Sequence, residues 1–598
     1  MLETSLGFAE AAKAPARQTT AAVILTLNSK AKPLSCMVED NATTKEVPAL
    51  VRGFISNHEI TYIGPLCPPA LVEPYIPWSS TTRSDDAGTF DTPPKITITY
   101  EQTHACRNIL LIGNQHDLMR EVIIDIWNGP TKALSMVHPI SRARDGVYLD
   151  AAVMCTKIEI TITGTVLPDR PASFYFVGSP STLIVERDHF ADLSVLEELG
   201  GGDLVPYSTV TANETDITLD NIDSIFTPSN KTSPLHGLMV PGLPIHVYMG
   251  VATQEDMFEI IPMGEFFTTE WSAPNGSAYS DITAHDLLYD LLDKELPLLR
   301  VVHAETIASL FRRIMTAMGI PDNKFRIEVK KTVPVTFGFA VGSNVGDALN
   351  AICEAGLCYI TTDRLGRIVM RDYVLNAPVI TMSDHDYIQT INNLERYNTI
   401  YSSLTVDIHE PILRRNDRML DGYDIVAEPG KRVLDDISFS SQPVLLLNSI
   451  ALLDTNEVKM TDIDYGHDRV RVTIMNNHLE NQKAKFQASA TYVDSIIRAR
   501  KTEGNTIGRS TMKITNPLVQ TGEHADMLLN GLKNAISDPF SLFEFASRSN
   551  PAVEVGDVAT LDAVSAKVFG EVVEIRRAEY RFDGGLECSY TARRVVYV

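Results

Sequence analysis

The sequence predicts a mainly β protein with α+β insertions, and three observations lead to that fold class. Lys95–Glu101 (KITITYE) and Lys157–Thr163 (KIEITIT) alternate apolar and polar residues, which is the two-residue period of a half-buried strand. His303–Gly319 changes to helical spacing, with apolar residues three or four positions apart. Asn550–Tyr597 returns to strand-like alternation broken by tight turns. Most of the chain should therefore be sheet, with short helical stretches between the strands.

The N-terminal part of the chain divides into an arm and a sandwich. Residues 1–20 are rich in Ala and Thr and carry no strand pattern, so we expect an N-terminal arm. Residues 21–190 contain strand-length runs separated by Pro, Gly and Asn clusters, which indicates a β-sandwich. Gly200–Gly202 is expected to be a linker at the domain boundary, because the GxxxxGK[ST] order of a phosphate loop is missing.

The remainder is expected to form three further domains. Residues 208–300 read as a first β-barrel domain, and residues 301–378 as a small α+β domain. In that small domain a helix across Ser343–Ala355 is followed by a hairpin that turns at Asp363–Gly366. Residues 379–598 are expected to be a second β-barrel domain with irregular insertions. The length of 598 residues fits this division, since about three to five domains are typical of such a chain.

The charge balance limits the partners. The formal net charge is −24, from 76 acidic and 52 basic residues. This argues against a nucleic-acid-binding surface, which needs clustered Lys and Arg. An acidic channel through which DNA passes without binding is compatible with the charge, but a solvated acidic surface that aids solubility is the preferred explanation for most of it.

Cysteine usage and the known catalytic motifs give no sign of a cofactor, a metal site or an enzyme. The chain has 7 cysteines, an odd number, and no CxxC pair, which fits free thiols in a reducing cytoplasm. HExxH and GxSxG are absent. Asp286, Asp290 and Asp293 share one helical face, but we expect a solvated face there rather than a cation site. No cleaved leader is expected, and no apolar run reaches the ~18–20 residues that span a bilayer.

Two aromatic residues are candidates for carbohydrate contact. Tyr75 and Trp78 lie in a Pro-flanked segment (PYIPWSS), where an exposed ring could stack on a sugar. The alternative for Trp78 is packing in the core. Trp127 lies in an apolar strand, so we expect it to pack in the core.

The order of segments in residues 21–190 resembles galactose-binding-like jelly-roll modules. PYIPWSS precedes PPKITITYE, and KIEITITGTVLPDRPASFYFVG closes the series. Such modules occur in phage tail proteins, so this resemblance implies a possible contact with cell-wall glycan.

Three further places resemble bacteriophage tail-tip or baseplate hub proteins. The first is ITLDNIDSIFTPSN…SPLHGLMVPGLPIHV at Ile217–Val247. The second is MGEFFTTEW…ITAHDLL at Met263–Leu288, together with the later hairpin TTDRLGRIVMRD. The third is SNPAVEVGDVATL at Ser549–Leu561, followed by GEVVEIRRAEYRFDGGLECSYTARR at Gly570–Arg594.

The hub resemblance implies two tube-like β-barrels and a homotrimer whose barrels close into a pseudo-sixfold ring around a channel. It also implies partners: the tail tube or distal tail protein, the end of the tape-measure protein, and spike or fibre proteins. DNA would pass through the lumen without specific binding. The location implied is the tail tip of a virion assembled in the host cytoplasm. If N-terminal strands belong to the first barrel, the sandwich is an insertion rather than a prefix.

The expected function is therefore that of a structural hub, not an enzyme. Two alternatives stay open: a host-surface carbohydrate-binding adhesin of the tail, and a tail-associated cell-wall hydrolase.

Overall fold

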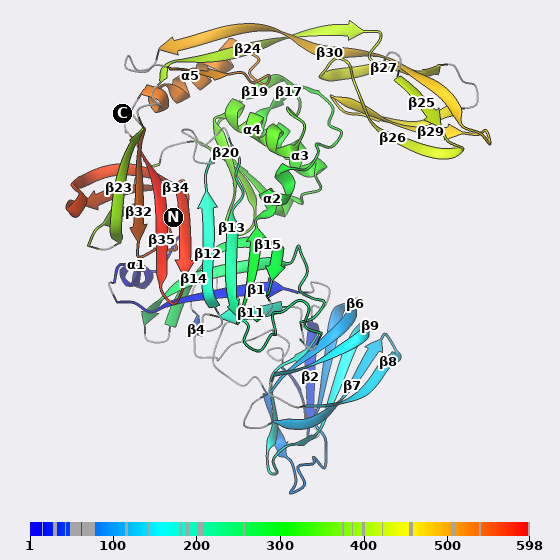
Figure 1. Ribbon diagram of the computed structural model, residues 1–598, viewed down its shortest axis with the longest axis vertical. Helices are drawn as coiled ribbons and strands as arrows, with labels where there is room; N and C mark the ends of the chain where they lie inside the picture. Colours follow the sequence, from blue (N-terminus) through cyan, green and yellow to red (C-terminus); the bar gives the residue numbers. More distant parts are fainter. Residues whose placement is uncertain are drawn as a thin grey trace.

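The computed structural model describes the chain except for residues 15, 28–32, 42, 48–60, 63–77, 114–117, 141–143, 180–181, 187–189, 201–208, 232, 234, 255–256, 275, 374–375, 386, 397–400, 421–422, 454–457, 504–509, 538–539 and 596–598. Strands dominate the described residues, which confirms the mainly β fold class. The molecule is elongated, with a sandwich at one end, a large sheet in the middle and a long β arm at the other end (Figure 1).

The large central sheet gathers strands from almost the whole length of the chain. Its main path runs β11-β1-β14-β15-β16-β13-β12-β34-β35-β32-β23, with β22, β33 and β4 attached at its sides. The bounds are β1 (Thr19–Thr26), β4 (Thr61–Tyr62), β11 (Thr182–Glu186), β12 (Phe190–Glu198), β13 (Glu214–Asp220), β14 (Pro244–Gln254), β15 (Met257–Ser272), β16 (Tyr279–His285), β22 (Ile380–Ser383), β23 (Ile388–Arg396), β32 (Phe540–Ser547), β33 (Val558–Ala563), β34 (Val568–Phe582) and β35 (Leu586–Arg594).

This sheet contains the same five-stranded unit twice. Unit 1 consists of β12 to β16, and unit 2 of β23 and β32 to β35. We number the five strands of each unit from first to fifth along the chain. Across the sheet, both units then have the order third, fourth, fifth, second, first. Every neighbouring pair within a unit is antiparallel.

Irregularities in register support the duplication. In the first strand the register shifts between Phe190 and Asp192 in unit 1 and between Ile388 and Thr390 in unit 2. In the fourth strand it shifts between Thr268 and Glu270, and between Ile575 and Arg577. Because β-bulges are specific local features, their agreement in position fixes which residues of the two units correspond.

The inserted sandwich occupies the chain between β1 and β11. Its sheet runs β3-β2-β6-β9-β7-β8, with β10 paired to β6 and β5 paired to β10. The bounds are β2 (Pro33–Asp40), β3 (Thr43–Glu46), β5 (Trp78–Arg83), β6 (Lys95–Gly113), β7 (Met119–Asn128), β8 (Thr131–Pro139), β9 (Arg144–Thr165) and β10 (Pro171–Gly178). The alternating runs predicted from the sequence lie in β6 and β9, and their apolar residues form one core with those of β7.

A small α+β body follows unit 1, as expected. It contains α2 (Leu287–Leu292), β17 (Val302–Thr306), α3 (Ile307–Ala317), η4 (Asp322–Lys324), β18 (Phe325–Glu328), β19 (Pro334–Gly338), α4 (Val345–Gly356), β20 (Cys358–Thr362) and β21 (Ile368–Asp372). The Asn344 side chain caps α4 by accepting from the Asp347 amide. The predicted hairpin is confirmed as β20–β21.

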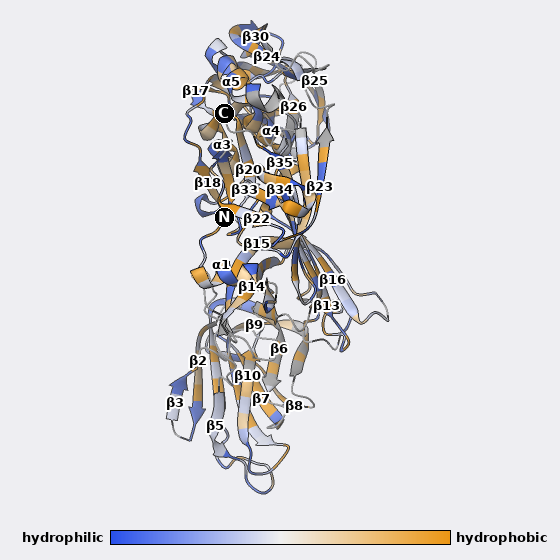
Figure 2. Ribbon diagram, turned by 90° about the vertical axis from the view of Figure 1, so that its left-hand side faces the viewer, coloured by the Kyte–Doolittle hydropathy of each residue, from blue (hydrophilic) through white to orange (hydrophobic). Residues whose placement is uncertain are grey.

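The arm, residues 401–514, lies between β23 and β32 in the chain. It contains β24 (Tyr401–Asn416), β25 (Tyr423–Ala427), β26 (Gly430–Ser438), β27 (Val444–Leu453), β28 (Val458–Tyr465), β29 (Arg469–Asn476), β30 (Gln482–Glu503) and β31 (Ser510–Ile514). The helix α5 (Gly522–Ser537) follows it and packs against β24. Seen from the side, the arm and the sandwich lie at opposite ends of the molecule (Figure 2).

Three expected boundaries differ from the structure. Residues 1–20 do not form a bare arm: α1 (Leu6–Lys13) buries Phe8 and Ala12 in the core under the central sheet, and β1 begins at Thr19. Unit 1 begins at β12 rather than at residue 208, and β1 joins its sheet. The sandwich is therefore an insertion and not a separate domain over residues 21–190.

The expected second barrel over 379–598 is likewise split by the arm, which forms two sheets of its own. These differences share one physical reason. A two-residue period identifies a strand but not its partner, because pairing depends on contacts between segments far apart in the chain.

Candidate assembly interface

The two units are joined edge to edge within one chain. β12, the first strand of unit 1, pairs antiparallel with β34, the fourth strand of unit 2. Glu198 lies opposite Arg577 at one end of this seam, and Leu193 lies opposite Phe582 at the other. The seam turns the two units into one continuous sheet.

The equivalent edges on the outer sides of the two units have no strand partner among the described residues. β23, the first strand of unit 2, pairs only with β32. β15, the fourth strand of unit 1, pairs with β14 only as far as Phe267, with Thr268 still bonded to the Leu243 carbonyl. Beyond Thr268 this side of β15 is open. Unpaired strand edges are templates for further strand pairing.

The correspondence between units predicts how these open edges would meet. Arg577 of the seam corresponds to Glu270 of β15, and Glu198 corresponds to Arg396 of β23. The seam pair of an acid opposite a base thus recurs at the open edges with the two charges exchanged. Opposite charges directly across an antiparallel pair are favourable.

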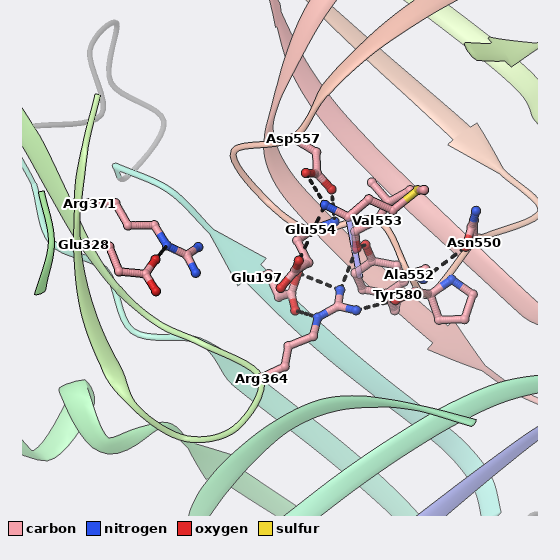
Figure 3. A network of polar contacts seen from close by, with 12 residues as sticks. Glu197, Glu328, Arg364, Arg371, Asn550, Ala552, Val553, Glu554, Asp557 and Tyr580 are labelled. Atoms are coloured by element: carbon pink, nitrogen blue, oxygen red, sulfur yellow. Dashed lines mark hydrogen bonds and ion pairs between the residues drawn. The ribbon is translucent and has the colours of Figure 1, made fainter. Parts of the chain in front are cut away.

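A buried arginine locks the small α+β body onto the seam. Arg364, at the tip of the β20–β21 hairpin, donates from Nε to Glu197 Oε1 at 2.5 Å and from Nη2 to Glu197 Oε2 at 3.0 Å (Figure 3). Nη2 also donates to the Val553 carbonyl at 2.7 Å, and Nη1 donates to the Pro551 carbonyl. The Tyr580 ring lies 5.3 Å from the guanidinium carbon. Glu197 belongs to β12 and Tyr580 to β34, so Arg364 contacts both strands of the seam.

Burial sets the electrostatics of this pair. The side chains of Arg364 and Glu197 are 4% and 5% exposed. Desolvation by burial raises the pKa of Glu197. Burial also disfavours the charge on Arg364, but the adjacent Glu197 carboxylate keeps the arginine pKa well above its usual value. Each charge therefore depends on the other, and the four donated bonds use four of the five N–H groups of the guanidinium.

The local sequence DRLGR builds the hairpin tip that presents Arg364. Asp363 accepts from the Leu365 and Arg367 amides, both at 3.0 Å, which ties the turn. Gly366 has φ +72°, and a Cβ there would lie 1.9 Å from Glu265 Oε2. The turn thus requires glycine both for its conformation and for its approach to β15.

The outward face of the two units is polar and acidic. Burial alternates strictly along β13, β16 and the C-terminal part of β34, so one face forms the core and the other meets solvent. The charged residues on the outward face include Asp192, Glu198, Glu214, Asp216, Asp220, Glu270, Asp281, Glu544, Glu579, Glu587, Arg577, Arg581 and Arg593. Carboxylates outnumber arginines there, and the face continues across the seam without a break.

The candidate sugar-contact residues receive little support. Tyr75 lies outside the described residues. Trp78 is 8% exposed and packs in the sandwich core, so its ring offers no face to a ligand. Trp127 departs from the expected core position: it lies half-buried on the outer face, where its Nε1 donates to Glu159 at 3.0 Å and Lys157 Nζ lies 4.3 Å from its ring centroid.

The aspartates that the sequence places on one helix face differ in their surroundings. Asp286 is buried and caps α2 by accepting from the Leu288 amide, whereas Asp290 lies on the exposed side. Within the described residues, no group of three or more His, Cys, Asp or Glu side chains is arranged to hold a metal ion. In the same part of the chain, no helix is long and apolar enough to cross a membrane.

Sequence reasoning named the DRLGR hairpin but missed its role at the seam. It also missed Glu197 and the seam itself. The only signal in the sequence was Arg364 itself, because the other residues of the DRLGR turn are explained by the turn alone.

No family model and no curated protein matches the sequence. The chain is 9% identical to the tail protein from Neisseria meningitidis MC58, covering 68% of this chain and 93% of that one, with a TM-score of 0.40. It is 11% identical to the 43 kDa tail protein of prophage MuSo2 from Shewanella oneidensis, over 68% and 95% of the two chains, with a TM-score of 0.39.

A component of the E. coli type VI secretion system, described as similar to bacteriophage T4 tail proteins, is 10% identical over 68% of this chain and 74% of that chain, with a TM-score of 0.31. Tail proteins are thus among the solved structures that this chain is similar to. The galactose-binding-like module stays a prediction.

Proposed function

We propose that the chain is a structural hub of a viral tail tip or a related baseplate, and that copies of it close into a ring through their open strand edges. One observation carries the proposal. Each chain holds two equivalent units joined first strand to fourth strand, and it leaves open one first strand and one fourth strand of the same kind. Repeating the same joint between chains closes the sheet and removes both edges.

Three copies would make a ring of six units. Such a ring fits a sixfold tube on one side and a threefold tip on the other, which is the role of a hub. The N-terminal sandwich and the arm extend from opposite ends of the central sheet, where they are available for fibre, spike or tape-measure partners.

The acidic outward face supports a channel that lets DNA through. If this face lines the ring, its carboxylates repel phosphates and keep the passage free of binding. A catalytic role forms no part of this proposal, and the chain acts by assembly.

The test is the oligomeric state of the purified chain. Mass photometry should give three times the chain mass of 66.0 kDa, and negative-stain images should show a ring with a central hole. A compact monomer at micromolar concentration, or an open filament, would refute ring closure. Zymography on envelope material should show no clearing; clearing would support the hydrolase alternative instead.

A further inference from the structure

A cavity of about 470 Å³ lies where the arm meets the small α+β body. Five segments line it: the loop between β19 and α4, β24, the residues before β27, the turn between β28 and β29, and β30, with Pro517 and Gln520 closing one side. The volume equals roughly fifteen water molecules, and it falls in the range of ligand sites. Figure 1 shows the arm passing over β19 and α4 at this place.

Much of the wall is apolar. Its apolar side chains are Phe339, Val341, Pro411, Pro443, Val493 and Pro517. A ligand with an apolar body would therefore gain from burial here.

Two histidines line the wall, and the tautomer of His467 makes one of its ring nitrogens a hydrogen-bond acceptor. His467 Nδ1 lies 3.1 Å from the Leu299 carbonyl and must donate to it, so Nε2 of the neutral ring carries the lone pair. Burial lowers the pKa of His467 and of His409, which favours the neutral rings. His409 Nδ1 lies 3.4 Å from Ser495 Oγ, and its Nε2 is buried without a hydrogen-bond partner.

The charged side chains of the wall are both acidic. Asp468 Oδ2 accepts from Arg469 Nη1 at 2.8 Å, whereas Oδ1 is buried without a hydrogen-bond partner. Asp494 is paired with Arg414 at 2.7 Å. In the part of the chain that the structure describes, neither lysine nor arginine lines the cavity.

We infer that this cavity binds an organic cation: an ammonium or guanidinium group on an apolar body. The group would pair with the Asp468 carboxylate, whose side chain is 22% exposed, and donate a hydrogen bond to His467 Nε2, while the body packs on the aromatic and proline walls. An anion would meet two carboxylates and find no cationic side chain in the wall. The site is independent of ring closure, because the described wall comes from one chain.

This chemistry has two possible sources, a free amine or a basic side chain of a partner protein. Both place the same group in the same cavity. Because the wall combines arm and body, either ligand should also strengthen the docking of the arm.

Three probes of similar shape and different charge test the inference on the full chain. Ligand-observed NMR and calorimetry would compare phenethylamine, 2-phenylethanol and phenylacetate at neutral pH. Phenethylamine should bind at least fivefold more tightly than the alcohol, and phenylacetate should show no saturation transfer. Acetyl-Gly-Arg-Gly-amide separates the sources: binding comparable to phenethylamine indicates a partner side chain, and much weaker binding indicates a free amine.

Two variants locate the binding. Asp468→Asn should weaken phenethylamine about fivefold, whereas Asp462→Asn, on exposed β28, removes the same charge from the arm and should change nothing. Val341→Trp, which fills the cavity, should abolish binding of all probes, with the thermal midpoint reporting that the fold is kept. Equal or tighter binding of phenylacetate, an unchanged affinity in Asp468→Asn, or no binding by any probe would overturn the inference.

Discussion

Arg364→Ala should strongly destabilise the molecule. It leaves the Glu197 carboxylate buried without its cation and removes a donor from the Pro551 and Val553 carbonyls, of which Val553 keeps the bond from the Tyr580 hydroxyl. Breaking a buried ion pair in this way costs about 3–5 kcal/mol. For a sheet of this size the thermal midpoint should fall by about 5–15 °C. Differential scanning fluorimetry measures that shift directly.

The expected change is also local. Hydrogen exchange should accelerate in β20–β21 and in the loop before β33, because Arg364 bonds the hairpin to the Pro551 and Val553 carbonyls of that loop. Arg577→Ala is the matched control: it removes an exposed arginine from β34 and should cost less than about 0.5 kcal/mol.

The double variant Arg364→Met with Glu197→Met separates two effects: the cost of leaving the Glu197 charge without a cation, and the loss of the contacts that Arg364 makes. Since no uncompensated charge remains, it should recover most of the lost stability. If Arg364→Ala melts within 2 °C of the parent, using the same scale of midpoint shifts, the guanidinium does not lock the hairpin.

Local structure followed from local sequence in this chain. The alternation of KITITYE predicted β6, helical spacing predicted α3, and the helix across Ser343–Ala355 and the DRLGR turn were recognisable from residue type. Each depends on neighbours a few positions away, and so the sequence alone carries the information.

The duplication could not be predicted, because equivalent positions in the two units share geometry and not residue identity. Ser194 corresponds to Asn392, Trp271 to Ala578 and Glu270 to Arg577. What the units share is strand order and the placement of bulges, which depend on pairing across hundreds of residues. The same limit hid the insertion of the sandwich and of the arm, and it hid the partner of Arg364.

A proline on β23 should abolish the ring while leaving the chain folded, provided that it replaces a residue whose amide points away from β32. In an edge strand, alternate amides point toward the paired strand and away from it. Asn392 and Asn393 are neighbours, so their amides point to opposite sides, and Asn392→Pro and Asn393→Pro together test both sides. The variant whose amide points to β32 should lower the thermal midpoint, and the other should leave it unchanged.

The proline variant whose replaced amide points away from β32 should be monomeric by mass photometry. A proline in the shared strand pair removes a donor and introduces a clash, together costing about 3 kcal/mol or more per joint, which is over a hundredfold in association. Thr44→Pro on β3, an exposed edge strand of the sandwich, is the control and should still form rings. If both β23 variants retain the ring, the joint does not use β23.

Charge exchange then tests the partner of β23 and not merely its involvement. The seam places Glu198 opposite Arg577, and the equivalent open positions are Arg396 and Glu270. Glu270→Arg sets like charges across the joint and should weaken it by about 0.5–1 kcal/mol per interface. Adding Arg396→Glu restores an opposite pair, so the double variant should reassemble at the parent concentration. A coupling of this sign can arise only if β23 of one copy lies beside β15 of the next in the register of the internal seam. Additive effects would mean that copies meet in a different register or through other strands.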